Sequence, residues 1–185
     1  MAGHRVSIRL DGSICFLLAL MLLLLPLQWV LAAIFAAMVH ELCHAGAILL
    51  LGGRIYSLRI GPNGMKMEMD LLLPGKELIA ALAGPAGSAL LVLLARWLPR
   101  TAVCGAVQCV YNLLPLFPLD GGRALGSAIC LCIPGRRGER VFDMIQKSIR
   151  LILALAFLLS LFRWGIFPAI AGFALLWRQR ETRTV

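Results

Sequence analysis

The chain has 185 residues, of which 61% are hydrophobic and only 15% are charged, and its formal net charge is +9. Apolar tracts of this length and number exclude an ordinary soluble domain and indicate a membrane protein with several spans. The 18 basic residues gather at the ends of the apolar tracts rather than on one folded face, which argues against a nucleic-acid-binding protein.

Six apolar segments are candidates for membrane-spanning helices, each of which needs about 20 residues to cross a bilayer. They cover approximately residues 13–26, 27–51, 77–98, 102–132, 148–161 and 164–177. The first has no small-residue signal-peptidase site after it, so we expect it to be retained as a helix. The sequence therefore predicts an all-α polytopic membrane protein. We expect a single domain with its core over residues 27–132, followed over 133–185 by a basic loop and two further spans.

The basic residues that flank these segments predict the orientation of the chain. With the N-terminus in the cytoplasm, thirteen of them fall on the inner side and Arg96, Arg100 and Arg163 fall on the outer side. Arg123 and Arg150 lie near segment ends and are not counted on either side. Because cytoplasmic loops of membrane proteins carry an excess of Lys and Arg, we expect both termini in the cytoplasm.

His40-Glu41-Leu42-Cys43-His44 lies inside the second apolar segment. Positions four apart share one face of a helix, so both imidazoles can bind one Zn²⁺ while Glu41 stands beside the metal as a general base. The alternative is a pair of core histidines that only satisfy carbonyls. Burying such a cluster in hydrocarbon costs kilocalories per charged group, which favours the functional interpretation. Cys43 points away from His44, and we expect it to pack rather than to bind metal.

The least membrane-like stretch lies between the second and third segments. Residues 56–60 and 65–69 each alternate apolar and polar side chains around the turn sequence Gly61-Pro62-Asn63-Gly64, which predicts a short β-hairpin. A protease acts on an extended peptide, so an edge strand beside the zinc would hold substrate by β-augmentation. The alternative is a hairpin that only packs at the membrane surface.

A catalytic zinc normally has three protein ligands, and Asp120 is the candidate for the third. The other acids considered fall in loops or at span ends, whereas Asp120 lies within the fourth apolar segment. Two prolines before it remove backbone donors and the two glycines after it permit positive φ, so this helix should break. Broken backbone within a membrane must be buried in protein or line a cavity. The alternative is a proline-kinked helix followed by an Asp-Gly-Gly turn at the surface.

These elements together resemble the site-2 proteases, zinc metalloproteases that cut substrates within the membrane. The resemblance rests on the His40 to His44 motif, on Ala83-Gly84-Pro85 in the third segment, and on residues 112–122, which are similar to the family element Asn-x-x-Pro-x-x-Pro-Leu-Asp-Gly-Gly. Position 43 is Cys where Gly is common. The layout of six segments is similar to the branch that contains a bacterial sporulation protease processing a pro-sigma factor, without the regulatory domain that many members append.

The resemblance implies that His40, His44 and Asp120 bind one zinc per chain and that Glu41 takes a proton from a zinc-activated water and returns it to the leaving amine. Asn112 either donates to the substrate or satisfies carbonyls freed by the prolines. His40 is about 20 Å into its segment at 1.5 Å per residue, which predicts cleavage near the cytoplasmic face.

The expected function is therefore an intramembrane endopeptidase of a bacterial membrane, acting on membrane-associated or transmembrane substrates in regulated proteolysis of a transcription or sporulation factor. The expected partners are the substrate and the lipid bilayer, with no nucleic acid. A metal or proton transporter and a catalytically silent scaffold are the alternatives. Transporters often contain repeats, and the histidine pair has no counterpart after residue 100. A structural zinc would need no base beside it.

For the small residues at 83–88 we favour close helix packing over a direct catalytic role.

Overall fold

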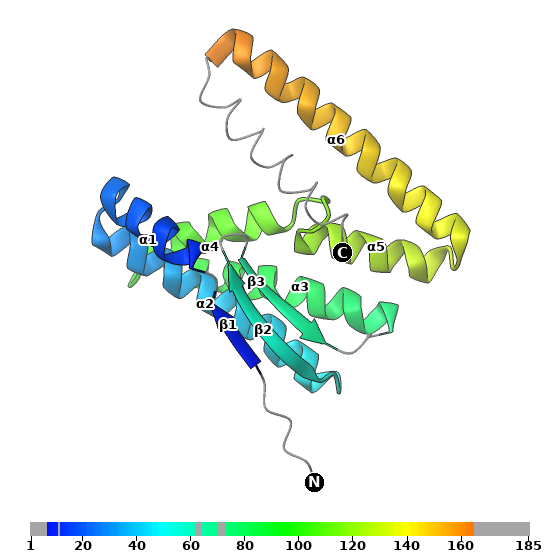
Figure 1. The fold of residues 1–185 in the computed structure, drawn as a ribbon, viewed down its shortest axis with the longest axis horizontal. Helices are drawn as coiled ribbons and strands as arrows, with labels where there is room; N and C mark the ends of the chain where they lie inside the picture. The colour runs from blue at the N-terminus through cyan, green and yellow to red at the C-terminus, as the bar shows by residue number, and fades with distance from the viewer. Residues whose placement is uncertain (1–6, 11, 62–63, 70–72, 165–185) are drawn as a thin grey trace. The chain divides into compact units, whose positions relative to one another are not determined.

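The computed structural model describes residues 7–10, 12–61, 64–69 and 73–164, and these are mostly helical (Figure 1). The chain divides into two compact units, with the boundary between Leu113 and Leu114. The single domain expected from the sequence stays a prediction.

The described residues of the first unit form four α-helices, a short 3₁₀ helix and three strands. Its helices are α1 Ser13–Leu24, α2 Leu27–Leu50, α3 Pro74–Leu90 with its continuation η1 Leu91–Leu94, and α4 Pro99–Asn112. Prolines mark where several of these helices begin: Pro26 precedes α2, and Pro74 and Pro99 are the first residues of α3 and α4. At these positions the missing N–H has no intrahelical partner to lose and the fixed φ suits a helix start.

Two of the described helices are long and apolar enough to cross a membrane. They are Leu27–Leu50, with 24 residues, and Pro74–Leu94, with 21. Both correspond to segments predicted from the sequence, and the second begins at Pro74 rather than near residue 77. The count of six spans stays a prediction.

Helices α2 and α3 pack closely because their facing residues are small. The buried positions of α3 are Ala80, Ala81, Gly84, Pro85, Gly87 and Ser88. A Cβ placed on Gly87 would overlap the sulfur of Cys43 in α2, and one placed on Gly105 in α4 would come within 2.7 Å of the carbonyl oxygen of Ser88. Cys43 therefore packs against α3, as predicted, and all six cysteines of the chain are unpaired.

The strands form one sheet in the order β1 (Ser7–Leu10), β2 (Ile55–Gly61) and β3 (Gly64–Met69). β2 and β3 pair antiparallel, whereas β1 pairs parallel to β2. Sequence analysis did not predict β1, because four residues in a basic N-terminal stretch give too short an alternation to identify. The consequence is that β1 covers one edge of β2, so β3 is an outer strand of the sheet (Figure 1).

The second unit contains α5 (Asp120–Cys132) and α6 (Arg136–Trp164). The expected basic loop over residues 133–147 is wrong, because α6 begins at Arg136 and runs through it; Arg, Glu, Lys and Gln are all good helix formers. Gly135, with φ of +80°, makes the turn between the helices. The predicted fifth span is the interior of this 29-residue helix, and the predicted sixth lies outside the described residues after Trp164.

The fourth apolar segment is interrupted, as predicted. α4 ends at Asn112 and α5 begins at Asp120, so residues 113–119 belong to no helix. The interruption contains Pro115 and Pro118, which cannot donate helical hydrogen bonds.

Candidate metal centre

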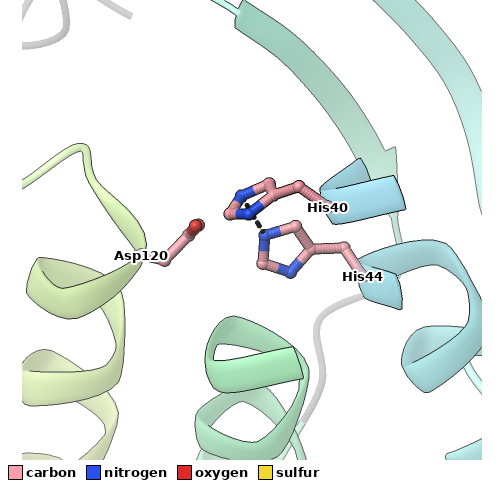
Figure 2. Close-up of side chains that lie close together, drawn as sticks. All are labelled: His40, His44 and Asp120. Atoms are coloured by element: carbon pink, nitrogen blue, oxygen red, sulfur yellow. Dashed lines mark hydrogen bonds between the residues drawn. The ribbon is translucent and has the colours of Figure 1, made fainter. Parts of the chain in front are cut away.

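His40 and His44 stand one helical turn apart on α2, and both are buried, with 3% and 7% of their surface exposed. Their Nε2 atoms lie 3.2 Å apart (Figure 2). The two rings meet edge to face, with centroids 4.7 Å apart and planes at 84°. The structure thus brings together the two imidazoles of the predicted motif, with the same nitrogen of each ring facing the other.

The other nitrogen of each ring is bonded to α3. His44 Nδ1 lies 2.7 Å from the carbonyl oxygen of Ala80, and His40 Nδ1 lies 2.9 Å from the hydroxyl of Ser88. A carbonyl oxygen only accepts, so in neutral His44 the proton is on Nδ1 and the lone pair is on Nε2. The Ser88 hydroxyl can either accept from or donate to Nδ1 of His40, so this contact orients the ring without fixing its tautomer. Histidines that bind metal usually donate their second nitrogen in this way.

Gly84 explains why there is room beside these nitrogens. A Cβ at this position would overlap Nε2 of His44 itself. The sequence-based preference for a pure packing role is therefore incomplete at Gly84. The missing side chain leaves room for the His44 ring, which is a candidate metal ligand, whereas at Gly87 it serves the contact with Cys43.

The remaining predicted residues have the following places. Glu41 follows His40 on α2 and is half-buried, and Asn112 is the last residue of α4 and is also half-buried. Asp120 is the first residue of α5 and is only 8% exposed. A carboxylate at this position is stabilised by the positive end of the helix dipole.

Gly122 has a different role from the one predicted. Neither Gly121 nor Gly122 has a positive φ; both lie in the first turn of α5. A Cβ on Gly122 would overlap the backbone of Leu116 and Phe117. The glycine is needed because the helix packs directly on the preceding segment, not because the backbone turns there.

Sequence analysis missed three groups that hold the candidate site in place. The Ala80 carbonyl and the Ser88 hydroxyl bind the histidine rings, and the side chain of Gln146 binds the segment before α5. Gln146 in α6 binds the carbonyl of Pro115, which the sequence had assigned to Asn112 as one alternative. A backbone carbonyl has no sequence signal. Ser88 closes the stretch of small residues at 83–88, which is the one signal that pointed to this face of α3.

The donor set can be tested against the metal that the sequence predicted. His40, His44 and Asp120 are buried side chains that offer metal-ligating atoms, namely two imidazole nitrogens and a carboxylate oxygen. Two histidines and one carboxylate are a set that catalytic zinc uses, with a position left for water. The residues present therefore fit zinc.

Comparison with known proteins identifies the family. The model of the family described as Peptidase M50B-like matches residues 13–118, more than half of the chain. Among solved structures, the chain is similar to the Site-2 Protease from Methanocaldococcus jannaschii, with a TM-score of 0.70 and 21% identity, covering 96% of this chain and 91% of that one. A search of curated proteins finds no match. The structural likeness shows the shared fold and the family match shows kinship, so the chain belongs to the Peptidase M50B-like family.

Proposed function

We propose that this chain is an intramembrane zinc endopeptidase that hydrolyses peptide bonds of membrane-associated or transmembrane substrates near the cytoplasmic face. The observation that carries the proposal is the histidine pair of α2. Two buried rings turn Nε2 toward each other while α3 holds both Nδ1 atoms, within a helix long enough to span a membrane. Family membership supports the same chemistry.

His40 and His44 are proposed as two zinc ligands through Nε2, and Asp120 as the third. The support for Asp120 is its carboxylate, its burial and its place after the interrupted helix. Zinc, when bound, supplies a Lewis acid that acidifies water and polarises the scissile carbonyl. Glu41 takes the proton from that water and passes it to the leaving amine, because the reaction needs one group to act as base and then as acid. Asn112 donates a hydrogen bond to the substrate backbone.

The substrate is proposed to bind in an extended form along β3. Only an unwound peptide exposes a scissile bond, and an outer strand offers unpaired N–H and C=O groups to such a peptide. β2 is paired on both sides, with β1 and with β3, and so leaves no edge free. This choice between the two strands of the predicted hairpin was open from the sequence.

The wider context follows the sequence-based predictions. We propose a multi-pass protein of a bacterial membrane with both termini in the cytoplasm and about six spans, acting in regulated proteolysis. A place in the sporulation branch stays a prediction from the sequence resemblance alone.

The Glu41→Gln variant separates a protease from a transporter or a silent scaffold. Because Glu41 is not a proposed ligand, the variant should keep about one zinc per chain and lose cleavage of tagged single-span membrane proteins co-expressed with it. Glu139→Gln, an exposed change of the same kind in the first turn of α6, is the matched control and should cleave normally. Normal cleavage by Glu41→Gln would contradict the protease proposal. Zinc uptake into liposomes by both wild type and this variant would support the transporter.

A further inference from the structure

Gln146 is a buried polar side chain that the proposed chemistry does not use. It lies in α6 and is 3% exposed, although the next two residues of the helix are exposed. Its Oε1 accepts from the backbone N–H of Phe117 at 3.1 Å, and its Nε2 donates to the carbonyl oxygen of Pro115 at 3.0 Å. Both ends of its amide are therefore paired with the interrupted segment that precedes α5.

The segment needs such a partner because it has left the helix. Buried backbone groups outside regular structure must be paired by other means, since each unpaired group costs free energy. The two groups that Gln146 binds flank Leu116, which is fully buried. A primary amide carries one acceptor and two donors at its tip, so a single glutamine satisfies both groups.

The segment in turn locates the first turn of α5. The backbone of Leu116 and Phe117 is in such close contact with Gly122 that a Cβ there would overlap it. The N–H of Leu119 donates to the carbonyl oxygen of Leu116 at 2.8 Å. Asp120 lies between these two contacts along the chain, so its position depends on where residues 115–117 are held.

We propose that Gln146 is a positioning residue that fixes residues 115–117 and, through them, the Asp120 carboxylate for metal binding. The proposal rests on the proposed function in one respect, the role of Asp120 as a ligand. The Gln146 amide binds backbone groups of Pro115 and Phe117, so it would act on Asp120 only through the backbone of this segment.

The test uses the full chain in detergent, with zinc as the probe. Gln146→Met keeps the length of the side chain and helix propensity but removes both hydrogen bonds. In the metal-free protein, amide exchange of a peptide covering residues 114–119 should rise at least tenfold. Zinc affinity, measured by competition with a chelator, should fall at least tenfold, or about 1.4 kcal/mol. Gln108→Met, a change of a half-buried glutamine in α4, is the matched control and should alter neither quantity.

A second pair of variants tests the route through Asp120. In an Asp120→Ala background, Gln146→Met should weaken zinc binding no further, since groups that act as a unit are not additive. Gln146→Glu keeps the acceptor for Phe117 and should show a smaller rise in exchange. It serves as the test variant if Gln146→Met does not accumulate.

The outcomes distinguish this proposal from the proposed function. Unchanged exchange over residues 114–119 in Gln146→Met would overturn the role of Gln146, whatever the zinc affinity. Raised exchange with unchanged zinc affinity, or an additive loss in the Asp120→Ala background, would overturn the link to the metal. Unchanged zinc affinity in Asp120→Ala alone would instead overturn the proposed ligand set.

Discussion

Replacing Ser88 by Ala tests whether α3 orients the two histidines that are proposed to bind metal. Ser88 is fully buried and its hydroxyl lies 2.9 Å from Nδ1 of His40. The substitution removes one oxygen and adds nothing, so it cannot clash with its neighbours. It leaves a buried ring nitrogen without this partner, at a place where no solvent reaches the serine. The ring is then free to rotate away from the orientation that aims Nε2 at His44.

The magnitude follows from the cost of losing such a partner. A buried polar group left unpaired costs about 1–3 kcal/mol, and removing the hydrogen-bond partner of a ligating histidine typically lowers metal affinity about 10–100-fold. We expect zinc affinity to fall within that range, less than for loss of a ligand. The assay is chelator competition on the purified full chain, with cleavage of a membrane substrate at saturating zinc as a second readout. Cleavage should recover when zinc is raised.

The matched control is Ser127→Ala. Ser127 is also buried, in α5 of the other unit, and has no role in the proposed chemistry. The zinc affinity of the Ser127→Ala variant should stay within about twofold of wild type, which corresponds to a change in binding free energy of well under ~1 kcal/mol. Equal zinc affinity in Ser88→Ala and wild type would refute the reasoning, as would an equal loss in both serine variants.

Three further predictions follow from the same arrangement. Asp120→Ala should lower zinc content sharply in metal analysis of the purified chain; full retention would place the third ligand elsewhere. Gly84→Ala should weaken zinc binding at least tenfold, because its Cβ would overlap Nε2 of His44. Gly46→Ala on α2 is the control, since the space around Gly46 is open. Equal zinc affinities of the two variants would contradict the steric argument. A proline scan of β3 should impair substrate processing at alternate positions and leave the zinc content unchanged. The reason is that every second N–H of an outer strand points away from the adjacent strand. Alanine at Lys66 or Glu68 should reduce processing less than proline does. If every folded proline variant cleaves normally, the sheet only packs.

The candidate ligands could be predicted from the sequence because metal chemistry needs particular residue types. His40 and His44 are recognisable by their spacing and by their place in an apolar helix, and the structure brings their Nε2 atoms together. The groups that orient them could not be predicted. One is a backbone carbonyl, which every residue carries, and the other is a serine on a helix that starts some 30 residues later in the chain.

The fold was predictable where apolar length or proline decides the structure. α2, α3 and the interruption before Asp120 fall close to the predicted positions. The strand β1 and the start of α6 were not predictable from local pattern. β1 exists through its pairing with β2, a partner more than 40 residues away. The first turns of α6 contain many charges, which resemble a loop between spans until burial of one side, including Gln146, is known.

Glycine illustrates the same limit within a single motif. Both glycines after Asp120 are compatible with a turn of positive φ, and that was the natural interpretation of Asp-Gly-Gly after two prolines. The structure assigns Gly122 to a helix whose backbone meets Leu116 and Phe117 too closely for any side chain. The residue type was therefore dictated by a neighbour's approach, which no local propensity encodes. Gly84 is the parallel case on α3, where the neighbour is Nε2 of His44, the nitrogen proposed to bind zinc. In each unit, then, a glycine lies next to a group on which metal binding is proposed to depend. Substitutions at these glycines should therefore lower zinc affinity more than they reduce helix content.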